Sequence, residues 1–577
     1  MKKIVVFLFL SIFCNFLIFS QAPKKPNSAE IYEAIQKLNF LGSVLYIAAH
    51  PDDENTRLIS YFSNDVKART AYLSLTRGDG GQNLIGPEIR ELLGVIRTQE
   101  LLAARKIDGG EQFFTRANDF GYSKHPDETM EIWNKEEVLK DVVAVIRKFK
   151  PDVIVNRFNH RTPGSTHGHH TSSAMLGFEA FDLSADTNYK TYLNNDTVWQ
   201  SKRLFFNTSW WFYGSQENFD NADKTNLIEL EIGTFYKHKG LSNSEIASLS
   251  RSSHQSQGFG STGSRGNQTE YLEFLKGDFP QNKNVFDGID TSWNRVEGGK
   301  AINNILTKVE QEYNFKNPAA SINGLVEAYK LIQNLKDEHW KQLKAEEIKN
   351  IIAACAGLYL EVVANNSSTT PNSENTINFE AINRSNQSII LKAVSINSLN
   401  ISEEKNLELK ENNAQEFSLN VVIPSEINFT FPYWLHKKGT LGMYKVENED
   451  LISLPETPKE IKADFLIDFN DYAIPFSKEV VYKYNDPVKG EVYKPFEILP
   501  EVSASFNEKV HIFSNENSQI IAIKVKAIKD NLAGKISLCI PDNWKVSPEN
   551  FNFKLTQKGE EQTFQFILTP PVIKSEG

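Results

Sequence analysis

The sequence predicts an α/β fold, with a Rossmann-like, doubly wound and mostly parallel sheet followed by a small helical segment and immunoglobulin-like β-sandwich domains. Three observations carry this prediction. Between residue 40 and about residue 210, short apolar runs alternate with helical patterns, which is typical of a parallel sheet with crossover helices. Residues 299–363 follow a helical period. Beyond a polar linker at 365–373, short strand-like runs alternate with turn residues, as in antiparallel sandwiches.

The elements of the first half follow in chain order. Short apolar and β-branched runs predict four strands, at 41–49, 69–75, 112–115 and 151–158. Apolar residues at helical spacing predict four helices, at 56–64, 87–107, 133–149 and 171–181. No G-x-G-x-x-G motif follows any of these strands, so we do not expect a dinucleotide site.

The second half divides into a spacer and two sandwich modules. Three apolar stripes predict three antiparallel helices in the spacer, residues 299–363. Alternating runs predict one β-sandwich module at 374–455 and a second at 463–577. The sequence stops soon after a strand and two prolines, which is compatible with a truncated second module. We expect the modules to bind glycan or to hold the first half away from a surface.

The first 22 residues have the pattern of a secretory signal peptide. Two lysines precede an apolar run at 4–19, and Ser20-Gln21-Ala22 offers a small-residue cleavage site. The run is also about long enough for a retained membrane anchor, which is the alternative. With the signal removed, we expect no transmembrane span in the mature chain. The expected location is outside the cytoplasm, in the periplasm or at the cell surface of a bacterium.

Composition narrows the classes of partner. The chain has 577 residues, enough for two to four domains. Its formal net charge is −10 and it lacks a basic tract, so nucleic acid is not an expected partner. Of three cysteines, Cys14 lies in the signal segment, and Cys355 and Cys539 lie in different segments, so no disulfide framework is predicted.

The candidate catalytic residues begin where the first predicted strand ends. Side chains at the carboxyl end of a parallel strand face the crevice in which open α/β sheets bind their ligands. His50 and Asp53 lie about one helical turn apart and can face one cation. Asp52 would then lie beside a metal-bound water, where a carboxylate can accept the water's proton. A helix cap and a solvated turn would explain the same residues without chemistry.

A histidine-rich segment after the fourth predicted strand offers the third ligand. Four of the chain's 11 histidines lie between residues 160 and 170. His170 would complete a His2Asp zinc site with an open position for water, and His167 would line the same pocket without binding metal. Such a site also accepts Fe²⁺, Co²⁺ or Ni²⁺. For His160 and His169 we expect a hydrogen-bonded loop position.

Four motifs together resemble the PIG-L or LmbE-like N-acetylglucosaminyl deacetylases. They are AHPDDE after the first strand, TRGDGG after the second, Arg97-Thr-Gln-Glu100 on a helix, and HGHH before a later helix. The resemblance covers roughly residues 40–295 and implies a metal-dependent deacetylase domain at 23–298. By this resemblance His50, Asp53 and His170 are the zinc ligands, Asp52 is the general base, and His167 polarises the substrate carbonyl.

The chain departs from the family pattern at two positions and leaves two arginines open to interpretation. His169 stands where the family often has Asp, and Ser165 stands where some members have Tyr. Arg77, in the glycine loop, could bind sugar hydroxyls or a phosphate, or could pair within the loop. Arg97 could line the pocket or form a pair on the helix surface. We assign both arginines to substrate binding.

The expected activity is zinc-dependent hydrolysis of an N-acetyl or other acyl group from an amino sugar or a GlcNAc-containing glycoconjugate. Metal-bound water would attack the amide carbonyl with Asp52 as general base. One alternative is a zinc amidase acting on another amide, such as a thiol-sugar conjugate. The other is a non-catalytic glycan-binding surface protein.

Overall fold

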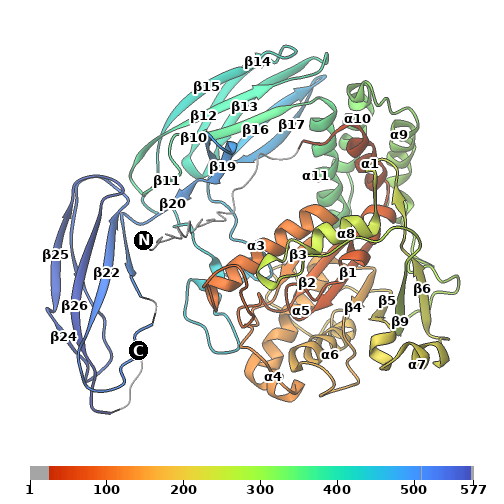
Figure 1. Ribbon diagram of the computed structural model, residues 1–577. Helices are drawn as coiled ribbons and strands as arrows, with labels where there is room; N and C mark the ends of the chain where they lie inside the picture. Colours follow the sequence, from red (N-terminus) through yellow and green to blue (C-terminus); the bar gives the residue numbers. More distant parts are fainter. Residues whose placement is uncertain (1–24, 509, 574–577) are drawn as a thin grey trace, which may run out of the picture.

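A seven-stranded sheet forms the centre of the first 300 residues (Figure 1). In this computed structural model, which describes residues 25–508 and 510–573, the strand order is β3-β2-β1-β4-β5-β9-β6. The first five strands of that order are parallel, and β9 runs antiparallel to both of its neighbours. The bounds are β1 (Ser43–Ala48), β2 (Arg69–Ser74), β3 (Glu111–Phe114), β4 (Val153–Asn156), β5 (Arg203–Thr208), β6 (Leu227–Glu231) and β9 (Thr269–Gly277). The expected signal peptide, residues 1–22, lies outside the described residues.

Helices cover both faces of this sheet, as a doubly wound fold requires. Val44 and Tyr46 of β1 pack in a core with α2 and α3, whereas Leu45 and Ile47 pack in a second core with α5 and α6. All six residues of β1 are buried, which explains why the run is continuously apolar. The helices are α2 (Thr56–Ser60), α3 (Glu91–Asp108), α4 (Pro126–Trp133), α5 (Lys135–Phe149), α6 (Gly168–Leu183), α7 (Gln216–Asn221) and α8 (Asn243–Arg251).

The predicted fold class is confirmed, and three helix bounds differ from those expected. The helix expected at 133–149 starts at Lys135 as α5, because α4 ends at Trp133 and the next residue, Asn134, has a left-handed φ of 56°. The helix expected from residue 87 starts at Glu91, after Arg90, whose φ is also positive. The helix expected at 56–64 continues after α2 as a π-helical turn.

The strand order places β1 beside β4, although β2 and β3 intervene in the sequence. The order of the strands reverses at this point, and α/β sheets bind ligands at such a switch point. The segments that follow β1 and β4 therefore lie next to each other at the carboxyl edge of the sheet.

Four helices and a β-sandwich share one core. These helices are α1 (Ser28–Leu38), α9 (Gly299–Gln311), α10 (Ile322–Gln333) and α11 (Glu338–Cys355). The spacer thus has the three predicted helices, and α1, which the sequence reading did not anticipate, packs Ile31, Ile35 and Leu38 into the same core. Helix α1 therefore packs with the spacer, although it lies within the range expected for the catalytic domain, 23–298.

The first sandwich consists of two sheets, ordered β15-β12-β10-β18-β19 and β14-β13-β16-β17. The expected boundary between a module at 374–455 and one at 463–577 is wrong, because β16 and β17 pair in the sheet of β13, and β18 pairs with β10. The bounds are β10 (Tyr359–Ala364), β12 (Glu374–Ile382), β13 (Ile389–Ile396), β14 (Ile401–Glu408), β15 (Gln415–Val422), β16 (Lys462–Phe469), β17 (Tyr472–Glu479), β18 (Val481–Asp486) and β19 (Gly490–Pro495).

The last module has a separate core of its own. One sheet has the order β21-β22-β26-β24, and the other pairs β23 with β25. The bounds are β21 (Val502–Phe506), β22 (Gln519–Ala527), β23 (Leu532–Ser537), β24 (Lys545–Ser547), β25 (Asn550–Leu555) and β26 (Glu561–Thr569). Short two-residue strands complete the inventory: β7 (Phe235–Tyr236) with β8 (Leu241–Ser242), and β11 (Ser368–Thr369) with β20 (Glu497–Ile498). Among the described residues, no helix is long and apolar enough to cross a membrane.

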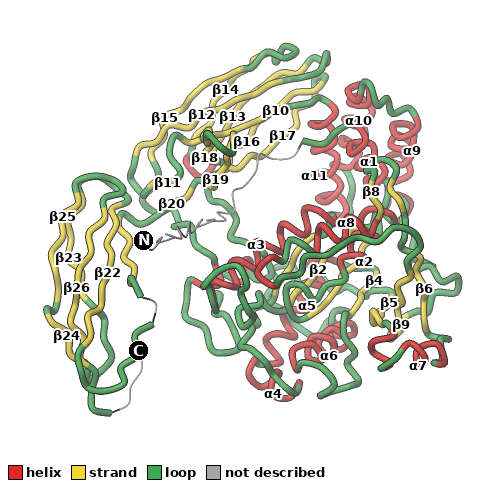
Figure 2. Tube along the Cα trace, in the orientation of Figure 1, coloured by secondary structure: helices red, strands yellow, loops and turns green. Residues whose placement is uncertain are grey.

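A long connection links the sandwich to the domain of the seven-stranded sheet. Residues 423–461, which we call the strap, join β15 to β16 and are drawn mostly as loop in Figure 2. The strap contacts the segment after β3: the backbone N–H of Asn118 donates to Gly442 O at 2.8 Å, and that of Tyr444 donates to Arg116 O at 2.8 Å. The sandwich region is thereby attached to the edge of the sheet on which the candidate site lies.

Candidate active site

The turn after β1 positions the first site residues. Tyr72 from β2 donates a hydrogen bond to the carbonyl of His50, and the backbone N–H of His50 donates to Asp53 Oδ2 at 2.8 Å. The imidazole of His50 also approaches Asp53, with Nδ1 3.1 Å from Oδ2. These contacts fix the His50 ring and the Asp53 carboxylate against each other at the strand end.

The start of α6 brings His170 to the same place. His170 Nε2 lies 3.4 Å from Asp53 Oδ1, and the His170 ring stacks on Phe158 with centroids 3.9 Å apart. One ligand atom from each of His50, Asp53 and His170 lies within 4.8 Å of the others. Two imidazole nitrogens and one carboxylate oxygen are a donor set found in catalytic metal sites.

The ionisation of His170 and Asp53 suits a divalent cation. For the third member, His50, burial would lower the pKa, but the charge and the hydrogen bond of Asp53 raise it above the ordinary value. Burial lowers the pKa of His170 to about 4, so its ring is neutral at pH 7. Burial alone would raise the pKa of Asp53, but the nearby imidazoles of His170 and His50 hold it well below the ordinary value, so the carboxylate is anionic. Metal coordination needs these two forms, neutral imidazole and ionised carboxylate. The residues therefore fit a metal ion.

A second grouping, His50 with His167 and His169, also brings three donor atoms together. It contains no carboxylate, and His169 is fully buried. In contrast, Asp53 and His170 line the pocket described below. The first grouping therefore has both an anionic ligand and an open side, which a catalytic site needs.

The carboxylate of Asp52 is held by an arginine. Its φ is 88°, in the left-handed region that only a few non-glycine residues adopt. Arg97 Nη2 donates to Asp52 Oδ2 at 2.7 Å. Burial raises the pKa of Asp52 to about 6, although the charge of Arg97 lowers it. A carboxylate with a pKa close to neutral, next to the donor set, is suited to accepting and returning a proton.

His167 is the N-cap of α6. Its Nδ1 accepts the backbone N–H of His169 at 3.2 Å. Burial and the charge of His50 lower the pKa of His167, so the ring is neutral and its proton resides on Nε2. His167 lines the pocket, where this N–H can donate a hydrogen bond.

His160 lies away from the site, stacked on Phe178. His169 does not lie in a loop as expected. His169 is fully buried between Phe120 and Trp133, with ring centroids 4.5 and 4.6 Å away. Its Nδ1 lies 2.9 Å from Nε2 of His50. His169 thus fixes the ring nitrogen of His50 that faces away from Asp53, which is the usual way in which a ligand histidine is oriented.

The prediction that Arg77 binds substrate is wrong. The Arg77 side chain is 0% exposed and stacks on Trp434 of the strap at 3.4 Å. Its guanidinium donates to the carbonyls of Leu454 and Pro455 at 2.9 and 3.0 Å. The sequence could not reveal these contacts, because the partners of Arg77 in the strap lie more than 350 residues away from it.

The prediction that Arg97 binds substrate is also wrong. Its guanidinium donates to Asp52, to Pro51 O and to Gly78 O, and it does not line the pocket. Gly78 has a φ of 74°, and a Cβ there would lie 2.4 Å from the guanidinium. The glycine loop therefore leaves room for Arg97, which positions Asp52.

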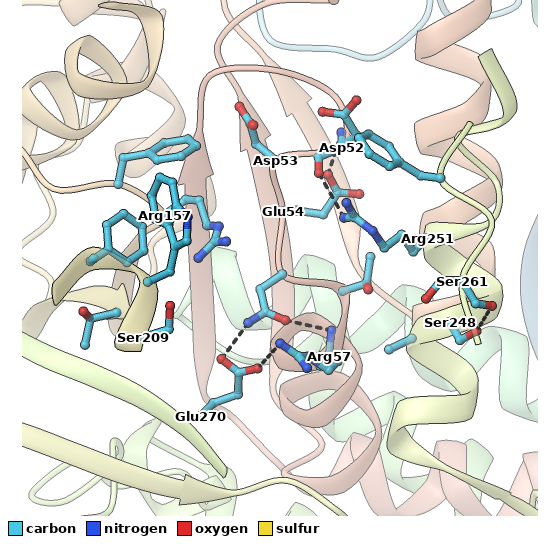
Figure 3. A pocket seen from close by; sticks show the side chains of 18 of the residues that line it. Asp52, Asp53, Glu54, Arg57, Arg157, Ser209, Ser248, Arg251, Ser261 and Glu270 are labelled. Atoms are coloured by element: carbon cyan, nitrogen blue, oxygen red, sulfur yellow. Dashed lines mark hydrogen bonds and ion pairs between the residues drawn. The ribbon is translucent and has the colours of Figure 1, made fainter. Parts of the chain in front are cut away.

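The pocket next to these residues has a volume of about 860 Å³. Figure 3 shows Asp52 and Asp53 at one end, the ion pair of Arg57 and Glu270 at the other, and Arg157 and Arg251 on opposite sides. The residues among these that the sequence reading missed are Arg57, Arg157, Arg251 and Glu270. Arg157 directly follows β4, so the strand-end argument used for the histidines would have identified it.

Comparisons with known proteins find similarity in part of the chain. Residues 45–181 match the model of the PIG-L family, described as GlcNAc-PI de-N-acetylase. No curated protein sequence matches the chain. Among solved structures, the chain is similar to the N,N'-diacetylchitobiose deacetylase from Pyrococcus horikoshii complexed with its inhibitor MPG, at 21% identity, with 28% of this chain and 59% of that chain covered and a TM-score of 0.23. The chain thus spans less than two thirds of that deacetylase.

Proposed function

Residues 45–181 form a PIG-L family segment, as the sequence motifs predicted, and from this premise we propose that the chain is a zinc-dependent hydrolase of acylated amino sugars. The reaction would remove an N-acetyl group from an amino sugar or a GlcNAc-containing glycoconjugate. The observation that carries the proposal is the convergence of His50, Asp53 and His170 beside Asp52, at the mouth of a large pocket.

The metal would be held by His50, Asp53 and His170. A Zn²⁺ ion bound there, or Fe²⁺, Co²⁺ or Ni²⁺ in its place, supplies Lewis-acid chemistry, since it lowers the pKa of water and polarises a carbonyl. His169 fixes the ring of His50, and the stack on Phe158 fixes the ring of His170. The chain therefore orients its two imidazole ligands before any metal binds.

The side chains around the ligands have distinct roles in the proposed reaction. Asp52 accepts a proton from the attacking water, and the Arg97 hydrogen bond keeps its carboxylate in place. His167 donates its Nε2–H to the amide carbonyl oxygen as negative charge develops there. When the C–N bond breaks, the protonated Asp52 returns its proton to the nitrogen, giving the free amine and acetate.

The far part of the pocket supports a sugar as the substrate. Trp211 lines it and is 58% exposed, and Phe212 lies beside it. Exposed aromatic faces of this kind provide apolar area on which a sugar ring can stack. Polar groups also line the pocket, among them Asn55, Ser209 and Gln268, and they can bind hydroxyls.

We also propose an exported location, which rests on the apolar segment at 4–19 after two lysines. The sandwich modules would hold the enzyme away from a surface or bind glycan. An N-terminal sequence of the secreted protein that starts at Pro23 would support export, and recovery of the intact chain from the cytoplasm would contradict it.

The experiment that tests the activity measures acetate release from N-acetylglucosamine as monomer, oligomer, phosphate ester and lipid-linked form. Purified protein is assayed as isolated, after chelation, and after zinc is restored. Release that disappears on chelation and returns with zinc supports the proposal. If the protein holds stoichiometric metal and no compound reacts, the amino-sugar substrate is wrong, and a screen of other amides, including thiol-sugar conjugates, follows.

A further inference from the structure

The carboxylates and the arginines that line the pocket differ in how they are paired. Four carboxylates line it, and each has a partner on the protein. Asp53 contacts the imidazoles of His50 and His170, and Asp52 accepts from Arg97. The two others are buried deeper, and their partners are described next.

Glu54 and Glu270 are also paired within the chain. Arg105 Nη2 lies 3.1 Å from Glu54 Oε1, and the His254 ring lies 2.9 Å from the same oxygen. Arg57 Nη2 lies 2.7 Å from Glu270 Oε1. Each carboxylate of the pocket lining thus already has a partner on the protein.

Two arginines of the pocket lining have no carboxylate partner in the described part of the chain. Among the described residues, neither Arg157 nor Arg251 has a carboxylate oxygen within 4.0 Å, although both line the pocket. Within residues 25–508 and 510–573, the hydrogen bonds of their side chains are long: Arg157 Nη1 to Asn207 Oδ1 at 3.5 Å, and Arg251 Nη1 to Asp52 O at 3.3 Å. Each guanidinium has five N–H donors, so most of them are left for a ligand.

Aromatic rings hold both guanidinium groups in place. Arg251 lies over Phe259 at 4.3 Å, and Arg157 lies between Phe158 and Phe212 at 5.9 and 5.8 Å. A guanidinium that rests on a ring still offers its N–H edges, and those edges match the two oxygens of a carboxylate or phosphate. Figure 3 shows the two arginines on either side of the space in front of Asp53.

We propose that this pocket selects an amino sugar that carries an anionic substituent, a carboxylate or a phosphate, which binds to Arg157 and Arg251. The inference rests on the proposed deacetylase function and adds the class of substrate to it. A neutral sugar would leave two cations of the pocket without a partner, whereas an anionic one would use them.

The test compares three substrates: N-acetylglucosamine, its 6-phosphate, and N-acetylmuramic acid, which carries a carboxylate. The quantity is the ratio of kcat/KM for each anionic sugar to kcat/KM for the neutral one, in Arg157→Gln, Arg251→Gln and the double variant. Arg161→Gln is the matched control, because Arg161 is paired with Glu273 and does not line the pocket. We expect a ratio of at least about ten that falls toward one in the double variant and is retained in the control.

A binding measurement separates this inference from the proposed activity. Glucosamine 6-phosphate and glucosamine are titrated calorimetrically into chelated protein, so that no metal attracts the phosphate. If glucosamine 6-phosphate binds more tightly than glucosamine, and the double variant loses this preference, the inference is supported even if no sugar releases acetate. Equal binding of the two sugars, or a preference for the phosphate that survives the loss of both arginines, overturns the inference. The proposed deacetylase activity would stand in that case if all three sugars release acetate. Whichever of the two anionic substrates has the higher kcat/KM shows whether the arginines prefer a phosphate or a carboxylate.

Discussion

Asp79 makes the stability of the protein depend on pH in a direction that is unusual for a carboxylate. Burial raises the pKa of Asp79 to about 7, against the lowering effect of the hydrogen bond from Tyr444 of the strap. Its second oxygen, Oδ2, has no hydrogen-bond partner. Between about pH 4 and pH 7 the folded chain therefore binds more protons at Asp79 than the unfolded chain does. The free energy of unfolding falls as the pH rises through this window.

The size of the effect follows from the two pKa values. With 3.8 in the unfolded chain and about 7 in the folded chain, raising the pH from 5 to 8 costs about 2.5 kcal/mol of stability through this one group. In Asp79→Asn this contribution is absent, because the amide does not titrate. The variant should therefore lose less stability than the parent over the same interval. Between pH 5 and pH 8 its melting temperature should fall by about 4 °C less than that of the parent, for a cooperative unit of about 300 residues.

The assay is thermal and urea unfolding of both proteins at pH 5 and pH 8. Asp223→Asn is the control, because Asp223 is exposed and its pKa lies below the ordinary carboxyl value, outside this window. Tyr444→Phe removes the hydrogen bond that lowers the pKa of Asp79, so its pH dependence should be steeper than that of the parent. Parallel pH profiles for the parent and Asp79→Asn would refute the reasoning.

Four further predictions concern the site and the strap. Asp52→Asn should lower kcat by about 10²–10⁴ while metal content, measured by atomic absorption, is unchanged; activity within a few-fold of the parent would remove Asp52 as the base. His170→Ala should lose metal in equilibrium dialysis, and a full metal complement in that variant would remove His170 from the ligand set. Arg77→Met should lower stability to urea by about 3–5 kcal/mol and expose the strap to protease, since buried carbonyls lose their charged donor; a strap that stays protected would contradict this. Trp211→Ala should raise KM for a sugar substrate about three- to tenfold, and an unchanged KM would exclude stacking on Trp211.

Local patterns predicted the sheet and the residues at its edge. The buried strand at 43–48 is continuously apolar, and the residues after it are polar, so His50, Asp52 and Asp53 could be placed at the carboxyl end of a parallel strand. The same argument placed the histidines after β4. Both inferences depend only on neighbouring residues and on the rule that parallel strand ends meet at one edge.

The misassigned positions depend on contacts between distant residues. Arg77 and Arg97 look alike in the sequence as cations near a glycine loop, yet one is enclosed by the strap and the other holds Asp52. The predicted boundary between the two sandwich modules was wrong for the same reason. Strands of similar composition can pair in either sheet, and only the pairing of β13 with β16 and of β10 with β18 shows to which module they belong.

The sequence by itself determined the fold class of the first 300 residues, the donor types of the candidate metal site and the carboxylate beside it. Each of these follows from short-range periodicity and from the chemistry of adjacent side chains. Only the tertiary structure decided which arginines face the pocket and which are buried elsewhere. The physical reason is that a guanidinium is satisfied equally well by a carboxylate, a carbonyl or an aromatic face, and the partner is supplied by whichever segment the fold brings next to it.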